Sequence, residues 1–121
     1  MSDKPAAAQY SEVITEIRTY QLKVGRREEF LQCFHTKVAP LFRSVGIAFV
    51  GPFCDLEKSD TIVWLRTFPS LSHREQMLKA FHECDEWESL RVVTGDMIEG
   101  ISQTIVLLPS GMLSGPVSAE R

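Results

Sequence analysis

The segment Thr61–Phe68 alternates like a β-strand, yet it carries bulky hydrophobic side chains on both of its faces. Alternation places three of them on one face and two on the other: Ile62, Trp64 and Phe68 against Val63 and Leu65. The segments 12–23 and 101–108 show the same two-sided pattern. A sheet built from such strands must be covered on both faces, which limits the folds that are open to the chain.

Hydrophobic residues at helical spacing separate these strands. Residues 26–45 carry one apolar stripe, within which Pro40 should kink or split the helix. Ser72-His73-Arg74-Glu75 fits a capping box that opens a second helix at Ser72. Gly51 and Pro52 predict a bulge in the segment 47–54. Six elements follow in the order strand, helix, strand, strand, helix, strand: 12–23, 26–45, 47–54, 61–68, 72–93 with a break near 85, and 101–108.

This order predicts an α+β fold with a ferredoxin-like βαββαβ subunit. Two helices cover one face of a four-stranded sheet, so the second apolar face needs another cover. A second copy of the chain supplies it most simply, which predicts a dimeric α+β barrel and a homodimer or higher homo-oligomer. We expect one domain over residues 11–108, a flexible N-terminus over 1–10, and a C-terminal tail over 109–121 that is flexible or packed on a partner.

Composition excludes several classes of function. The 13 Lys and Arg residues against 16 Asp and Glu leave a net charge of −3, which argues against a nucleic-acid binder. No apolar stretch is long enough for a membrane span or a signal peptide. Cys33, Cys54 and Cys84 form no CxxC pair, so we predict no metal site and a cytoplasmic location. No glycine-rich phosphate loop is present, and we predict no cofactor, although flat ligands such as flavin or haem need no linear signature.

Polar and aromatic residues share faces of two predicted strands. Glu16, Arg18 and Tyr20 are spaced by two residues, as are Trp64, Arg66 and Phe68. If the two faces coincide, they form an aromatic-walled pocket that holds a carboxylate, guanidinium groups and a phenol. The tentative catalytic residues are Glu16, Arg18 and Tyr20, and the expected ligand-binding residues are Trp64, Arg66, Phe68, Phe49 and Phe53.

In this pocket, Glu16 or Tyr20 would act as general acid or base, and an arginine would stabilise an anion or enolate. Buried charge is costly without a partner, so Glu16 should pair with Arg18 or Arg66. The alternative is a structural ion pair at a dimer interface, because ionic networks also occur without a catalytic role.

Several short motifs resemble the NIPSNAP family. Glu16-Ile17-Arg18-Thr19-Tyr20 followed by Lys23-Val24-Gly25 is similar to the opening strand of that family, which typically reads E-x-R-x-Y and then Lys-x-Gly. Gly46-Ile47 with Val50-Gly51 resembles its second strand, and Arg74 with Asp85-Glu86-Trp87 resembles the segment of its second helix. The resemblance spans roughly residues 12–108 and implies the dimeric α+β barrel superfamily.

The resemblance also shapes the functional expectation. Where the family often has His-x-Trp-x-Tyr in the third strand, this chain has Trp64, Arg66 and Phe68 and lacks the histidine, so a proton-transfer role at that position does not carry over. The resemblance to the family implies a small-molecule-binding barrel of uncharacterised activity. Related barrels suggest a cofactor-independent enzyme, of monooxygenase, cyclase or lyase type, on an aromatic or polyketide-like compound. The alternative is a non-catalytic interaction or sensing module with a packed interior.

Overall fold

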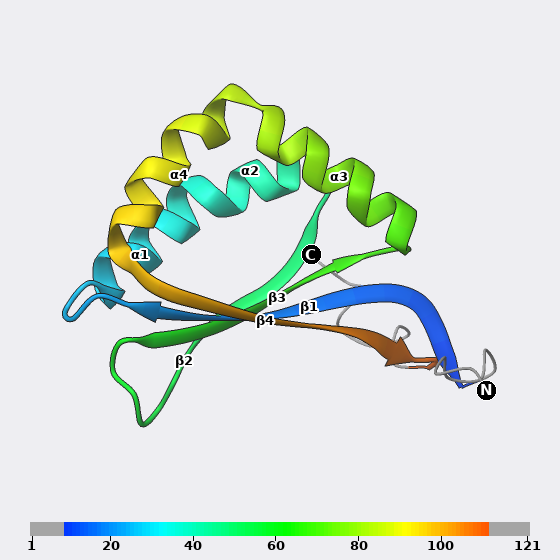
Figure 1. The fold of residues 1–121 in the computed structure, drawn as a ribbon, viewed down its shortest axis with the longest axis horizontal. Helices are drawn as coiled ribbons and strands as arrows, with labels where there is room; N and C mark the ends of the chain where they lie inside the picture. The colour runs from blue at the N-terminus through cyan, green and yellow to red at the C-terminus, as the bar shows by residue number, and fades with distance from the viewer. Residues whose placement is uncertain (1–8, 112–121) are drawn as a thin grey trace.

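The computed structural model describes residues 9–111 and builds them into a layer of helices over one antiparallel sheet (Figure 1). The elements are β1 (Tyr10–Leu22), α1 (Arg27–Cys33), η1 (Phe34–Val38), α2 (Ala39–Ser44), β2 (Ala48–Cys54), β3 (Thr61–Phe68), α3 (Leu71–Glu83), α4 (Asp85–Met97) and β4 (Ile98–Pro109). The predicted βαββαβ order is confirmed, with each of the two helical regions divided into shorter pieces.

The four strands lie in the order β2-β3-β1-β4, so β1 pairs with both β3 and β4. Glu16 lies opposite Arg66 across the β1–β3 ladder, and Arg18 lies opposite Trp64. The two sets of residues at spacing two therefore share one face, as expected. Helices cover this face of the sheet and leave the other face uncovered within the protomer (Figure 1).

Pro40 divides the first helical region in an unexpected way. A single π-helical turn, η1, separates α1 from α2, and the N–H of Ala39 donates to the carbonyl oxygen of Phe34 five residues back. Pro40 then falls in the first turn of α2, where a missing N–H costs least. The split predicted from the proline is confirmed, and the π turn keeps the apolar stripe facing the sheet on both sides of it.

The start and end of the second helical region differ from the prediction. Ser70, not Ser72, caps α3, and its Oγ accepts the N–H of His73 at 3.3 Å. The predicted capping box is wrong because the helix begins at Leu71, with only two residues between it and the end of strand β3 at Phe68. The helix after the break, α4, runs to Met97 rather than 93, and in these last turns Thr94 and Met97 are buried.

Strand β2 contains the predicted bulge, and the bulge separates two phenylalanines. Phe49 pairs with Arg66, but the register shifts by one residue between Val50 and Phe53, so that Phe53 pairs with Val63. A one-residue shift moves a side chain to the opposite face of a sheet. Phe49 therefore packs under the helices against Phe34, whereas Phe53 lies on the uncovered face and is half exposed.

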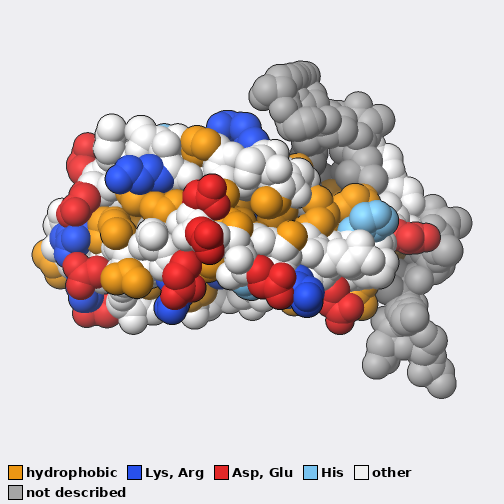
Figure 2. All heavy atoms as spheres, turned by 90° about the horizontal axis from the view of Figure 1, so that it is seen from above, with side chains coloured by type: hydrophobic (Ala, Val, Ile, Leu, Met, Phe, Trp, Pro, Cys, Tyr) orange, Lys and Arg blue, Asp and Glu red, His pale blue; other side chains and the backbone are white. Residues whose placement is uncertain are grey.

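The surfaces outside the core also carry apolar side chains. Figure 2 looks onto the helices and shows hydrophobic side chains along the middle of this side, with acidic side chains beside them. Leu71 of α3 and Val92 and Val93 of α4 are exposed. No helix within residues 9–111 is long and apolar enough to cross a membrane. The predicted terminal segments 1–10 and 109–121 lie largely outside the described residues, although β1 already begins at Tyr10 and β4 ends at Pro109.

Candidate functional site

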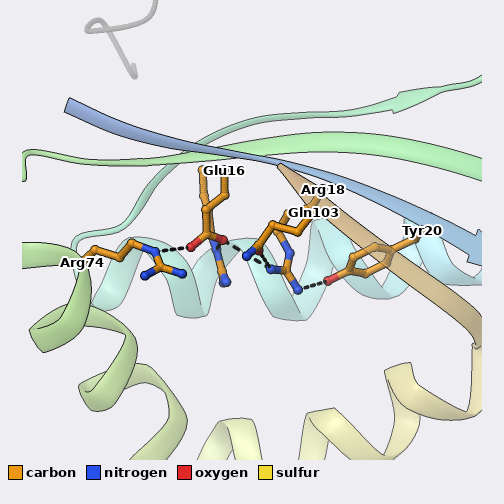
Figure 3. A network of polar contacts seen from close by, with 6 residues as sticks. Glu16, Arg18, Tyr20, Arg74 and Gln103 are labelled. Carbon is orange, nitrogen blue, oxygen red and sulfur yellow. Dashed lines mark hydrogen bonds and ion pairs between the residues drawn. The ribbon is translucent and has the colours of Figure 1, made fainter. Parts of the chain in front are cut away.

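Glu16 is the centre of a network of three arginines on the helix-covered face (Figure 3). Its carboxylate is fully buried. The Nε of Arg66 on β3 donates to Oε1 at 2.5 Å, and the Nε of Arg74 on α3 donates to Oε2 at 2.6 Å. Nη1 of Arg18 donates to Oε1 at 3.3 Å. Both carboxylate oxygens are therefore satisfied, and the network ties the sheet to α3.

The electrostatics of Glu16 follow from these contacts. Burial acts to raise its pKa, but the positive charge and hydrogen bonds of Arg66 and Arg74 outweigh burial, so the pKa lies below its ordinary value. The carboxylate is thus ionised at neutral pH and has no free oxygen for a proton. Within this protomer Glu16 orients guanidinium groups.

Arg18 lies between Glu16 and Tyr20, and it also contacts the edge strand. Its Nη2 donates to the hydroxyl oxygen of Tyr20 at 3.3 Å, and its Nη1 donates to Oε1 of Gln103 on β4 (Figure 3). The guanidinium lies 5.5 Å from the ring centroid of Trp64 and 5.6 Å from that of Tyr20. These contacts hold a cation against two aromatic faces at the boundary between the ion network and the core.

A cavity of about 200 Å³ opens beside this network, between the sheet and the helices. The sheet supplies the polar groups of Arg18, Tyr20 and Arg66, and the helices supply most of the apolar wall. The lining residues are Arg18, Tyr20, Phe30, Phe34, Val38, Phe42, Trp64, Arg66, Phe81, His82, Trp87, Arg91, Thr94, Gly95, Ile98 and Ile101. Arg91, Gly95 and Ile101 are exposed, so the cavity opens between α4 and β4.

The aromatic wall is continuous. Trp64 stacks on Phe42 at a ring-centroid distance of 5.3 Å, and Phe42 contacts Phe81 at 4.8 Å. Phe81 in turn packs against Trp87 at 4.8 Å. Offset and edge contacts of this kind are favourable between rings, and they leave ring faces and edges for a further aromatic group.

The structure brings together part of the predicted site. Arg18, Tyr20, Trp64 and Arg66 line the cavity, and Glu16 lies directly behind two of them. Three expected ligand-binding residues are not in the lining. Phe68 is buried in the core beneath Arg66, Phe49 packs among helix residues, and Phe53 points to the opposite face of the sheet.

Several residues of the site were not predicted. Arg74 belongs to the ion network because α3 crosses β1, and no local pattern connects residues 16 and 74. Phe34, Phe42 and Phe81 lie at helical spacing with other apolar residues, which predicts that they face the core, but helical spacing does not show where two layers leave a gap. Trp87, Leu90, Thr94 and Met97 repeat at helical spacing, and this signal could have revealed that α4 continues past the cavity.

His82 adds a titratable group to the cavity from α3. Its pKa lies below the ordinary value because burial, and then the positive charges of Arg66 and Arg18, disfavour the imidazolium. The site therefore combines a neutral imidazole, a phenol and guanidiniums around an aromatic pocket. Such an arrangement can bind a small ring compound and stabilise negative charge on its oxygen atoms.

Comparison with known proteins agrees with this architecture. The chain resembles a NIPSNAP-like domain protein from Burkholderia xenovorans at 23% identity, over 85% of this chain and 90% of that chain, with a TM-score of 0.75. A NIPSNAP family protein of unknown function from Agrobacterium tumefaciens is similar at 24% identity, over 89% of this chain and 98% of that chain, with a TM-score of 0.75. These likenesses show the fold.

A protein from Nitrosomonas europaea that carries the name of an antibiotic biosynthesis monooxygenase shares the fold at 13% identity, over 80% of this chain and 90% of that chain, with a TM-score of 0.65. No curated protein matches the chain. The family model for NIPSNAP matches residues 15–110, which include β1 from Thr15 onward, the other three strands and every helix of the site. The chain belongs to the NIPSNAP family.

Proposed function

We propose that this protein binds a small aromatic or other apolar molecule in the cavity between sheet and helices and acts on it with its own side chains. The observation that carries the proposal is the cavity itself: an opening of about 200 Å³ whose apolar wall is mostly aromatic and which Arg18, Tyr20 and Arg66 line together from the sheet. Small-molecule sites in proteins commonly have this composition. An engineered cavity of about 150 Å³ is known to accept benzene, so the space here suits one ring with a substituent.

Tyr20 and Arg18 are the residues to which we assign the catalytic step. The hydroxyl oxygen of Tyr20 accepts a hydrogen bond from Arg18, and no acceptor among residues 9–111 takes its proton. Tyr20 can therefore exchange a proton with a bound molecule while Arg18 stabilises the resulting oxyanion. Proton removal next to an oxygen is a step that oxygenation, cyclisation and elimination can share, so monooxygenase, cyclase and lyase types all remain within the proposal.

Glu16 has a different role in this proposal from the one its residue type suggests. Because three arginines hold its carboxylate ionised, it positions Arg18 and Arg66 at the cavity wall. The network lies on the helix-covered face and within one chain, whereas the second copy that we propose would pair through the uncovered face. An ion pair at that interface is therefore not needed to explain these residues.

The two tryptophans of the sequence, Trp64 and Trp87, both line the cavity, so intrinsic fluorescence reports on its occupant. We expect single-ring compounds to change this fluorescence with saturation at about 1 mM or below, a free energy of about −4 kcal/mol or better. Gly95 also lines the cavity, and a Cβ built there meets no atom within 4 Å. Gly95→Phe should fill the space and abolish binding, while Gly95→Ala should fold and bind like the wild type.

The same experiment separates the proposal from its alternative. If benzyl alcohol, benzamide and benzoate all leave the fluorescence unchanged, and Gly95→Phe behaves like Gly95→Ala, then the cavity holds no ligand. The protein would then be a non-catalytic interaction or sensing module, and the binding proposal would be rejected.

A further inference from the structure

We infer that the molecule bound in this cavity is an acid, namely a single aromatic or similarly flat unsaturated ring that bears a carboxylate, with the carboxylate paired to Arg18 and Arg66. This inference rests on the proposed binding function and adds the charge and size of the ligand to it. It follows from the balance of charge at the site, from donors that lack acceptors, and from the shape of the apolar wall.

The charge at the site is not balanced by the protein. One buried carboxylate, Glu16, serves three guanidinium groups, those of Arg18, Arg66 and Arg74. The residues that line the cavity add Arg91 and include no aspartate or glutamate in the part of the chain that the structure describes. Arg91 is exposed and already paired with Glu88, so the excess positive charge lies deep in the cavity, at Arg18 and Arg66. An anion is the ligand that such a wall attracts.

Hydrogen-bond donors are also in excess at the same wall. Arg66 is more than nine-tenths buried, yet within residues 9–111 only its Nε has an acceptor, which leaves both Nη groups for another partner. The buried Nε of Arg18 and the buried Nε1 of Trp64 likewise have no acceptor in the described residues. Guanidinium groups match a carboxylate with paired N–H donors, so a carboxylate supplies acceptors as well as charge.

Mutual repulsion of the arginines also favours an anionic ligand. The pKa of Arg66 lies below its ordinary value because burial, and then the positive charge of Arg18, disfavours its protonated form, and Glu16 compensates only in part. A bound carboxylate near both guanidiniums would offset this repulsion.

The rest of the cavity excludes a bare inorganic anion as the preferred ligand. Phe34, Phe42 and Phe81 offer only apolar contact, and together with Trp87 and the arginines they line a space of about 200 Å³. This volume suits one ring and a carboxylate rather than a fused polycyclic compound. We therefore narrow the ligand from aromatic or polyketide-like compounds in general to single-ring acids.

The test compares two probes of the same shape, benzoate and the neutral amide benzamide, by titration of tryptophan fluorescence. In the wild type we expect benzoate to bind at least about tenfold more tightly than benzamide. In Arg18→Gln the two affinities should become similar, because the charge at the cavity wall is reduced while a polar side chain is kept. Arg43→Gln is the matched control, since Arg43 stacks on Phe49 outside the cavity, and it should retain the preference.

Further measurements keep the result decisive if Arg18→Gln folds poorly. Added sodium chloride should weaken benzoate binding to the wild type and leave benzamide binding unchanged. Arg66→Lys, which keeps a charge beside Glu16 but loses the paired donors, should lower the affinity for benzoate more than that for benzamide.

Each other outcome counts against a specific statement. Equal binding of benzoate and benzamide to the wild type would overturn the inference of an acid and leave the proposed binding function intact. Absence of binding by both probes, together with no effect of Gly95→Phe, would overturn the proposed function and this inference with it. A preference for benzoate that persists in Arg18→Gln and Arg66→Lys would overturn the assignment to these arginines.

Discussion

Arg66 donates its Nε to Oε1 of Glu16 at 2.5 Å from the position directly opposite on the neighbouring strand. The antiparallel register of β1 and β3 therefore creates the ion pair, and the helices above bury it. Removal of one partner from a buried pair leaves the other charge without compensation, which is more costly than the pair itself is stabilising. The stability of the fold is thus linked to the same residues that shape the cavity.

We expect Glu16→Gln to destabilise the protein by about 3–5 kcal/mol, because it leaves three guanidiniums without their shared carboxylate. Urea denaturation of the wild type and the variant measures this difference. Glu12→Gln is the control, since Glu12 lies on the same strand and is exposed, and it should change stability by less than about 0.5 kcal/mol. Similar stabilities of the two variants would show that the network contributes little.

The low pKa of Glu16 predicts a dependence of stability on pH. A carboxylate whose pKa is lower in the folded state stabilises the fold above its unfolded pKa of about 4.3, and this contribution is lost as the pH falls toward the folded pKa. The difference in unfolding free energy between wild type and Glu16→Gln should therefore shrink on acidification below about pH 4. A difference that stays constant from neutral pH to acid would contradict the assigned direction of the shift.

Gly51 should tolerate substitution less well than Gly25, although both have a positive φ. A Cβ at Gly51 would lie 3.2 Å from the Cβ of Trp64 and 3.2 Å from the backbone nitrogen of Phe53, whereas at Gly25 it meets no atom within 4 Å. Gly25→Ala should cost about 1–2 kcal/mol from backbone strain alone. Gly51→Ala should cost clearly more in thermal or urea unfolding, and equal costs would refute the tight packing of the bulge against β3.

The uncovered face of the sheet predicts self-association. Its strands carry apolar side chains that no helix of the protomer covers, among them Ile17, Val63, Leu65, Val106 and Leu108. We propose that two copies pair through this face, which would bury these side chains.

Leu65→Lys should therefore reduce the mass that light scattering measures after size exclusion, while Val24→Lys, at an exposed loop position, should not. A wild type that is monomeric at all accessible concentrations would contradict the proposed pairing.

Much of the sheet could be predicted because strand alternation is a local property. The face shared by Glu16, Arg18 and Tyr20 followed from their spacing, and Thr61–Phe68 was predicted with the bounds that the structure gives it. Phe53 is among the expected ligand-binding residues, but it lies on the face opposite the cavity, because the position of a bulge decides on which side the following residues point. Gly51 and Pro52 indicated the bulge, but its effect on Phe53 depends on which residue of β3 lies opposite.

The N-terminal cap of α3 is another feature that the local sequence pattern did not decide. Ser70 and Ser72 are both suitable caps, and the serine that is used depends on where the chain turns upward from β3. The π turn before Pro40 is another case, since the proline required an interruption of the helix but did not specify its form.

The sequence by itself determined the order of the elements, the residues on each face of β1 and β3 and the family to which they correspond, because these depend on spacing along the chain. Only the tertiary structure decided that Arg74 joins Glu16, that Phe53 turns away, and that the helices leave an aromatic cavity beside Arg18 and Arg66. The reason is that contacts between layers depend on how helices cross a sheet, and no periodicity within one segment encodes that crossing.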